Sequence, residues 1–409
     1  SDRTKIKKAD QYDAVRKTVK ENKLDAIIVV GGDDSNTNAA QLAEFLKDDN
    51  CTVVGVPKTI DGDLQVGEQL PISFGFSTAT RTYAELVGNI CQDTPSSRKY
   101  WHFIKLMGRS ASHVTLEVAL QTMPTVTLIS EEIQEKKWSL DHVVTYIADS
   151  VKNRSQKGLN YGVVLIPEGL IEFIPELQVL IQELNHLVAT HAEIYEKPSL
   201  EEKKSILDAN LDPDLYKLFE SLPLSIQIEL VRERDAHGNL QVSQIPTETL
   251  LIEMVTAKLG SEAPDVPFNT NAHFFGYEGR CGAPSYFDAV FTYNLGIIAG
   301  SLALREKTGY LASITDLELG GRGLAIPLTG LIQSEVREGK PSFVIKKALV
   351  SLNSPAFKYF SERRDQWSKE DTFSSPGPRQ FWGPLSQELP ITVALNQNYN
   401  SLQFKLGNQ

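Results

Sequence analysis

Short apolar runs that alternate with amphipathic helical segments are the feature that most constrains the fold of this chain. Strands are predicted at 25–30, 52–56, 101–106, 125–129 and 161–166, and helices between them at 36–47, 77–91, 110–122 and 139–153. Continuous apolar strands separated by helices are typical of a parallel sheet that is buried on both faces. We therefore expect an α/β protein with mainly parallel sheets covered by helices.

Length and composition limit the number of lobes and the kinds of partner that the protein can have. A chain of 409 residues is too long for one ordinary core, so we expect two or three lobes. The net charge of −11 argues against nucleic acid or an anionic membrane as the main partner. Three widely spaced cysteines, with no apolar run long enough to span a membrane, favour reduced thiols in a cytoplasmic protein. The chain opens on a charged helical segment without Met, which we interpret as a missing beginning.

Two regions depart from the alternating pattern. From 174 to 260 apolar residues recur at helical spacing, which predicts a helical insertion used for packing or oligomerisation. A further helix is predicted from about 285 to 308. After Leu352 the sequence becomes rich in Ser, Pro and Trp, which predicts an extended tail.

Glycines and charged residues fall where four predicted strands end. They occupy 31–34, 57–63, 107–109 and 167–169. Ligands of parallel sheets bind beyond the carboxyl ends of the strands, so these loops are expected to form one site.

The first of these loops combines a phosphate-shaped turn with two carboxylates. Gly31 and Gly32, followed by Ser35 where a helix opens, present backbone N–H groups to an anion. Asp33 is then placed to hold a divalent cation that bridges phosphate oxygens. Asp34 would repel a phosphate by about 4 kcal/mol at ~4 Å and an effective dielectric of ~20, so it is expected to exclude an anionic group. The alternative is an ordinary polar turn in which Asp34 is solvated.

The second loop carries the parts that phosphoryl transfer requires. Asp61 and Asp63 lie two residues apart, close in sequence to Lys58. A reaction of this kind needs a base for the attacking hydroxyl, a metal ion, and cations on the equatorial oxygens. We predict Asp61 as the base, with Lys58 and Arg109 as the cations. A solvated acidic loop is the alternative.

Two further loops suit a sugar phosphate. Glu168 could accept hydrogen bonds from sugar hydroxyls, and the planar fork of Arg280 matches a phosphate. The histidines lack metal-ligand spacing and are interpreted as structural or surface residues: His102, His113, His142, His186, His191, His237 and His273.

Taken together, these motifs resemble phosphofructokinases, and within them the long pyrophosphate-dependent kind. The matches are GGDDSNTNAA at 31–40, PKTIDGD at 57–63, GFSTA at 75–79, KYWHFIKLMGRSASHVTLE at 99–117, PEG at 167–169 and GYEGR at 276–280. The resemblance implies the phosphofructokinase fold, with two Rossmann-like lobes whose mainly parallel sheets are covered by helices. It also implies reversible phosphoryl transfer from pyrophosphate to the 1-hydroxyl of fructose 6-phosphate, which gives fructose 1,6-bisphosphate and phosphate.

The resemblance also implies roles for individual residues. Asp61 accepts the proton of the sugar hydroxyl, Asp33 binds Mg²⁺, and Arg109 stabilises the transferring phosphoryl group. Lys99 and Tyr100 match a pair that the family contributes from a partner subunit, which implies a homodimer. The other implied substrate residues are Thr59, Ile60, Asp63, Met107, Gly108, Glu168, Tyr277 and Arg280.

Donor choice follows from two positions at which ATP-using relatives carry glycine. The resemblance implies that Asp34 occupies the space and charge of a nucleotide α-phosphate, while Lys58 supplies a cation to pyrophosphate. Gly31, Gly32 and Ser35 complete the implied donor site.

The implied domains are discontinuous in sequence. Residues 1–98 with 281–335 form a donor lobe that lacks the family's first strand and Gly-rich loop, and 99–173 with 261–280 form a sugar-phosphate lobe. Residues 174–260 are the helical insertion, and 336–409 form a C-terminal helix and a wrapping tail.

Two other functions compete with this interpretation. The chain could be an ATP-dependent phosphofructokinase or sugar kinase; lipid and NAD kinases share the Gly-Gly-Asp turn, but the loops at 57–63 and 107–109 argue against them. It could instead be a non-catalytic regulatory subunit of the same family. The missing first strand favours that alternative, whereas the intact Asp61, Asp63 and Arg109 weigh against it.

Overall fold

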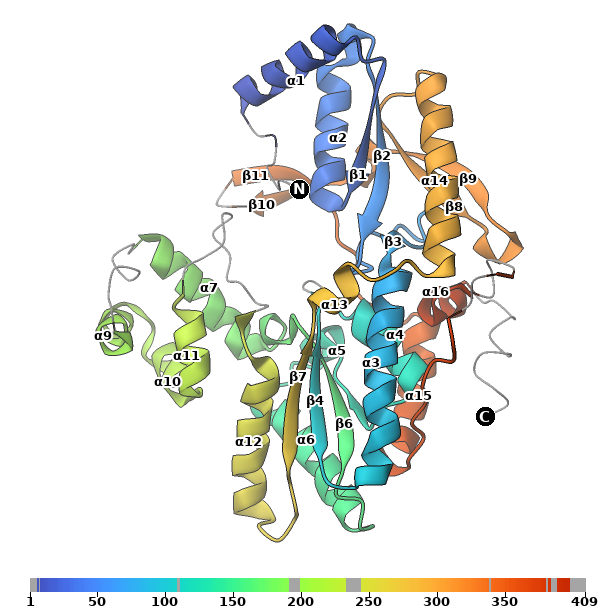
Figure 1. Cartoon of the computed structure of the whole chain (residues 1–409). Helices are drawn as coiled ribbons and strands as arrows, with labels where there is room; N and C mark the ends of the chain where they lie inside the picture. The colour runs from blue at the N-terminus through green and yellow to red at the C-terminus, as the bar shows by residue number, and fades with distance from the viewer. Residues whose placement is uncertain are drawn as a thin grey trace. The chain divides into compact units, whose positions relative to one another are not determined.

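The computed structural model places the described residues in two compact units (Figure 1). It describes residues 6, 8–108, 111–190, 199–232, 244–337, 340–379, 382–383 and 388–397. The first unit comprises Ser1–Thr80, Arg280–Ala348 and Pro378–Gln409, and the second comprises Arg81–Gly279 and Leu349–Gly377. Each is a mainly parallel sheet with helices, so the predicted α/β class is confirmed.

The sheet of the first unit has the strand order β1-β2-β8-β9, with β3 (Phe74–Gly75) paired to the end of β2. β1 (Ala26–Gly31), β2 (Thr52–Thr59) and β8 (Tyr310–Thr315) are parallel, and β9 (Arg322–Pro327) is antiparallel to β8. Among the described residues no strand pairs with the outer edge of β1.

Helices cover both faces of this sheet. On one face α2 (Asp33–Phe45) packs against β1 and β2, and α1 (Ala9–Asn22) joins the same apolar cluster. On the other face α14 (Tyr286–Leu304) crosses β2, β8 and β9 (Figure 1). The hairpin of β10 (Ile332–Arg337) and β11 (Lys340–Ile345) lies against α2. Short 3₁₀ turns occur at Lys47–Asp49, Leu317–Leu319 and Leu328–Leu331, and α16 (Ile391–Asn396) ends the described chain.

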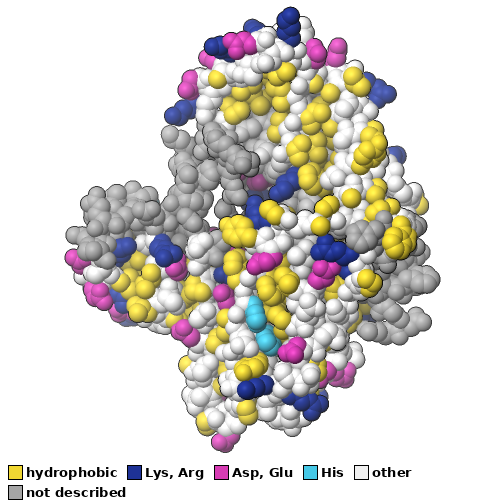
Figure 2. All heavy atoms as spheres, viewed as in Figure 1, with side chains coloured by type: hydrophobic (Ala, Val, Ile, Leu, Met, Phe, Trp, Pro, Cys, Tyr) yellow, Lys and Arg dark blue, Asp and Glu magenta, His cyan; other side chains and the backbone are white. Residues whose placement is uncertain are grey.

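Helix α14 is apolar on its outer side as well as on its sheet side. Phe287, Phe291 and Leu295 are fully buried, whereas Tyr293 and Ile297 are 72% and 52% exposed. Figure 2 shows hydrophobic side chains gathered on the visible face of this unit. Within the described residues α14 is the one helix long and apolar enough to cross a membrane, but core helices of globular proteins meet the same criterion.

The second unit is built on a fully parallel sheet with the order β5-β6-β4-β7. The strands are β5 (Val126–Thr127), β6 (Gly162–Pro167), β4 (Trp101–Leu106) and β7 (Thr270–Phe275). α6 (Leu140–Ser155) and α12 (Thr247–Glu262) pack together, and α12 contacts β4 and β7. The remaining helices around this sheet are α3 (Phe76–Ser97), which begins in the first unit, α4 (His113–Thr122), α5 (Ser130–Glu135) and α15 (Pro355–Lys369).

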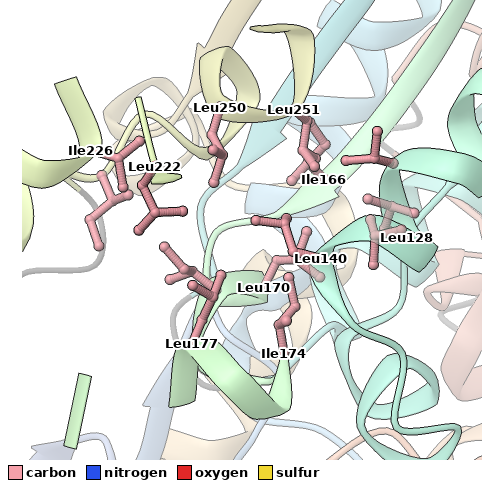
Figure 3. Packing of buried hydrophobic residues seen from close by; sticks show 14 of the residues in the cluster. Leu128, Leu140, Ile166, Leu170, Ile174, Leu177, Leu222, Ile226, Leu250 and Leu251 are labelled. Atoms are coloured by element: carbon pink, nitrogen blue, oxygen red, sulfur yellow. The ribbon is translucent and has the colours of Figure 1, made fainter. Parts of the chain in front are cut away.

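The helices predicted between 174 and 260 are present in the described residues and share the core of the second unit. They are α7 (Pro175–Thr190), α9 (Leu200–Asn210), α10 (Pro213–Ser221) and α11 (Leu224–Leu230), preceded by a 3₁₀ turn at Leu170–Glu172. Leu177, Leu222 and Ile226 lie in one apolar cluster with Leu140 and Ile166 (Figure 3). The insertion is therefore packed onto the sheet rather than separate from it.

Two predicted boundaries were wrong for identifiable reasons. Helix α2 begins at Asp33 rather than at Asn36, because carboxylates in the first turn are favoured by the helix dipole. The segment after Leu352 is not an extended tail from its start, because it contains α15, a helix that the domain assignment of 336–409 had included. The Ser354 hydroxyl accepts from the Phe357 N–H, and Pro355 stands at the first helical position.

Candidate active site

The turn between β1 and α2 is held tightly by the helix that follows it. Asn36 is fully buried, and its Nδ2 donates to the carbonyl oxygens of Gly31 at 2.7 Å and Gly32 at 2.9 Å. A Cβ on Gly31 would lie 2.4 Å from the side chain of Ser35, so only glycine fits. The predicted donor residues Gly31, Gly32 and Ser35 thus form one compact turn at a helix N-terminus, a geometry suited to an anion.

The loop after β2 is fixed by its own hydrogen bonds. The Asp61 N–H donates to the Thr59 hydroxyl at 3.1 Å, and Gly62 adopts a left-handed conformation with φ 73°. Ile60 and Asp63 are buried, whereas Lys58, Thr59 and Asp61 are half-buried. The loop therefore holds Asp61 in a defined position without a bound ligand.

Three of the predicted acidic residues gather with one lysine that the sequence did not indicate. Lys347 Nζ lies 4.0 Å from Asp33 Oδ2 and 3.9 Å from Asp63 Oδ2, so these two oxygens are at most about 8 Å apart. Burial, followed by the charge of Asp61, raises the pKa of Asp63 to about 7; the charge of Asp33 adds to this and Lys347 opposes it. We call Asp33, Asp61 and Asp63 the acid cluster. Asp34, by contrast, is exposed on the first turn of α2.

The raised pKa of Asp63 predicts a stability that depends on pH. A carboxyl whose pKa is higher in the folded state stabilises the fold below about pH 4 and loses this contribution as the pH rises through about 7. We expect Asp63→Asn to raise the unfolding midpoint at about pH 8 and to change it little at about pH 4, measured by thermal unfolding in a chelator. The exposed Asp48→Asn is the control. Equal midpoint shifts at both pH values would contradict the prediction.

In the second unit, Glu168 fixes the turn that follows β4. Its carboxylate is 2% exposed and accepts the N–H of Gly108 at 2.9 Å, while its own N–H donates to the Leu106 carbonyl. Met107 is buried, and its N–H donates to the Phe275 carbonyl at the end of β7. The structure therefore brings together Met107, Gly108 and Glu168 as predicted. Arg109 lies outside the described residues.

A short helix after β7 carries the two residues predicted to hold the 6-phosphate. Tyr277 and Arg280 lie on α13 (Tyr277–Arg280), and both are exposed. The fully buried Tyr83 of α3 donates its hydroxyl to the Gly276 carbonyl, and a Cβ on Gly279 would meet its ring at 2.4 Å. Tyr83 therefore fixes this helix, a role that the sequence did not reveal because the partners are 193 residues apart.

Lys99 and Tyr100 do not join the other predicted residues of the second unit. They precede β4, whereas Met107 and Gly108 follow it. A six-residue strand at ~3.3 Å per residue separates them by about 20 Å. Lys99 Nζ lies 5.2 Å from the centre of the Tyr100 ring. This pair cannot act with Met107 and Gly108 of the same chain.

His102 of β4 and His273 of β7 lie against each other. Nδ1 of His102 and Nε2 of His273 are 3.0 Å apart, and burial, with the nearby His273, lowers the pKa of His102 to about 4. His191 and His237 lie outside the described residues. Within the described part of the chain, no three His, Cys, Asp or Glu side chains are close enough to hold a metal by themselves.

Comparison with known proteins identifies the family. A family model described as phosphofructokinase matches residues 1–303. The chain is 47% identical over 408 residues to the pyrophosphate–fructose 6-phosphate 1-phosphotransferase subunit beta of Solanum tuberosum, which covers 97% of this chain and 69% of that protein. The pyrophosphate–fructose 6-phosphate 1-phosphotransferase of Treponema pallidum is also 47% identical, over 97% of this chain and 71% of its own length.

Solved structures agree on the fold. The pyrophosphate-dependent phosphofructokinase of Nitrosospira multiformis superposes with a TM-score of 0.54 at 15% identity, covering 93% of this chain and 76% of that one. Parallel strands that end in a glycine turn and an acid cluster define a class of α/β proteins suited to phosphorylated ligands. Within that class, the chain belongs to the phosphofructokinase family.

Proposed function

We propose that this chain catalyses reversible phosphoryl transfer between pyrophosphate and the 1-hydroxyl of fructose 6-phosphate. The structural observation that supports the proposal most strongly is the acid cluster. Relatives that are 45–47% identical to the chain are named for this reaction. The same relatives do not favour the ATP-dependent or the non-catalytic alternative.

Asp61 is the general base of the proposed mechanism. It accepts the proton of the sugar 1-hydroxyl as the hydroxyl oxygen bonds to phosphorus, and the bridging P–O bond of pyrophosphate breaks to release phosphate. The hydrogen bond from its N–H to the Thr59 hydroxyl orders the backbone that carries this carboxylate before substrate binds. Lys58 and Arg109 neutralise the charge that develops on the phosphoryl oxygens.

The acid cluster fits Mg²⁺. This hard cation prefers oxygen ligands and is usually held by one or two carboxylates together with substrate phosphates, so a full set of protein ligands is not required. Asp33 is the proposed ligand, and Asp63 is close enough to the same region to contribute. When bound, the cation neutralises phosphate oxygens and aligns the donor.

The two units divide the substrates between them in this proposal. The first unit holds the donor through Gly31, Gly32, Ser35 and Lys58. The second holds the sugar phosphate through Met107, Gly108 and Glu168, whose buried carboxylate is already oriented by a backbone N–H. Tyr277 and Arg280 bind the 6-phosphate through a hydroxyl and a planar guanidinium. We place the enzyme in the cytoplasm, where both substrates would be found.

A direct assay tests the proposed function. Purified protein is given fructose 6-phosphate with pyrophosphate or with ATP, and fructose 1,6-bisphosphate is measured. Turnover is expected with pyrophosphate and in the reverse direction with phosphate. Faster turnover with ATP would contradict the assignment of pyrophosphate as the donor. No turnover with either donor would favour the non-catalytic alternative.

We also propose a homodimer in which Lys99 and Tyr100 complete the partner subunit's site. The separation of this pair from Met107 and Gly108 along β4 supports the idea, because the pair has no access to its own chain's loops at the other strand end. In a two-fold dimer, each site would then combine residues of both subunits.

Mixing inactive variants tests the shared site. Asp61→Ala and a Lys99→Ala, Tyr100→Ala double variant are each expected to be nearly inactive. Co-refolded heterodimers contain one complete site, so the mixture should recover about a quarter of wild-type activity if subunits pair at random. Activity no higher than that of the separate variants would contradict the shared site.

A further inference from the structure

We propose that Lys347 is a further cation of the phosphoryl-transfer site and that its ammonium binds the anionic donor. The inference rests on the proposed function, because it assigns this residue to the same reaction. Lys347 follows β11 in the sequence and lies outside every motif that indicated the site. Its Nζ is nonetheless within 4.0 Å of Asp33 Oδ2 and 3.9 Å of Asp63 Oδ2.

The backbone on either side of Lys347 is hydrogen-bonded to the segments that carry Asp33 and Asp63. On one side, the Ile345 N–H donates to the Thr37 hydroxyl at 3.2 Å, and this hydroxyl donates to the carbonyl of Asp33. On the other side, the Ala348 N–H donates to the carbonyl of Asp63 at 2.7 Å. Val344 and Ile345 are almost fully buried. The position of Lys347 is therefore built into the fold, unlike that of an ordinary surface lysine.

The two separations show that the ammonium of Lys347 lies within ion-pair distance of both carboxylates. Neither 3.9 Å nor 4.0 Å is short enough for a hydrogen bond to that carboxylate. The Lys347 side chain retains 32% exposure, so a ligand can reach it. A flexible stem with a compact charge suits a residue that balances the acid cluster at rest and turns to a phosphate when the donor arrives.

Charge balance gives the reason for such a residue. The carboxylates of Asp33 and Asp63, each about 4 Å from Lys347 Nζ, place negative charge where the polyanionic donor is proposed to bind. A cation beside them offsets this repulsion, and its effect is strong because Asp63 is buried away from screening solvent. The sugar hydroxyl is neutral and gains nothing from this charge, so Lys347 is expected to act on the donor alone.

Binding of inorganic pyrophosphate in the presence of Mg²⁺, measured by calorimetry on the whole chain, tests the proposal. Lys347→Met is expected to weaken pyrophosphate binding by about tenfold or more, and Lys347→Arg, which keeps the charge, to recover most of the loss. Lys346→Met is the matched control, since it removes the same charge from the exposed neighbouring residue and should leave binding unchanged. Equal pyrophosphate affinity for Lys347→Met and Lys346→Met would overturn the proposal.

A second measurement separates this inference from the proposed function. Mn²⁺ binding without any phosphate, followed by electron paramagnetic resonance, should be tighter in Lys347→Met by about threefold or more, because a positive charge beside Asp33 and Asp63 is gone. Unchanged Mn²⁺ affinity relative to Lys346→Met would also overturn the assignment of Lys347. If the wild-type protein binds no pyrophosphate, the proposed function is contradicted, whatever the Mn²⁺ result. A purely structural lysine would lower the unfolding midpoint without changing either affinity.

Discussion

Replacing Asp61 with Asn is expected to lower kcat with pyrophosphate by about a thousandfold while the affinity for fructose 6-phosphate stays within about threefold of wild type. Asn keeps the size of the side chain but cannot accept the hydroxyl proton. The N–H of residue 61 still bonds to Thr59, so the loop should keep its shape. Stopped-flow turnover and calorimetric titration with fructose 6-phosphate measure the two quantities separately.

The control for this experiment is a carboxylate outside the acid cluster. Asp48 is exposed in the same unit, and Asp48→Asn should leave kcat unchanged. A loss of less than about tenfold in Asp61→Asn would mean that another group is the base. In that case Asp63 is the next candidate, since its pKa of about 7 allows it to exchange a proton near neutral pH.

The double change Asp34→Gly, Lys58→Gly is expected to shift the donor preference from pyrophosphate toward ATP. Removing Asp34 relieves a repulsion of about 4 kcal/mol at ~4 Å and an effective dielectric of ~20, which corresponds to roughly a thousandfold in affinity. Removing Lys58 takes a cation from pyrophosphate. We expect kcat/KM to rise at least about tenfold for ATP and to fall at least about a hundredfold for pyrophosphate.

Two further variants show whether charge or space decides the donor. Asp34→Asn alone removes the charge but keeps the side-chain volume, so ATP affinity should improve less if the side chain also blocks the nucleotide. Lys47→Gly with Asp48→Gly makes the same change of charge at exposed positions of the same unit and should alter neither donor. Unchanged ATP affinity in the Asp34, Lys58 double variant would leave Asp34 as a favourable first-turn residue of α2 and nothing more.

The sequence predicted most of the regular elements because their signals are local. β4 matches its predicted bounds, and β1, β2 and β6 differ by a few residues. The errors arose where a neighbour distant in sequence extends an element. β2 continues to Thr59 because its last residues, Lys58 and Thr59, pair with β3.

The residues of the candidate site could be predicted only in part from the sequence. The loops at strand ends could be found because glycine and charge interrupt apolar runs, and the structure places Asp33, Asp61 and Asp63 together, as it does Met107, Gly108 and Glu168. The catalytic and binding roles of these residues stay predictions. Tyr83 and Lys347 were missed because an isolated tyrosine in a helix and a lysine in a tail carry no local pattern.

By itself the sequence determined the class of fold and the strand-end loops in which glycine and charged residues gather. These depend on periodicity, on glycine and on charge, which are properties of neighbouring residues. Only the tertiary structure decided that Lys347 lies beside Asp33 and Asp63, that Tyr83 fixes α13, and that Lys99 and Tyr100 lie a strand's length from Gly108. Those arrangements follow from burial and hydrogen bonding between segments far apart in the chain, and no local pattern encodes them.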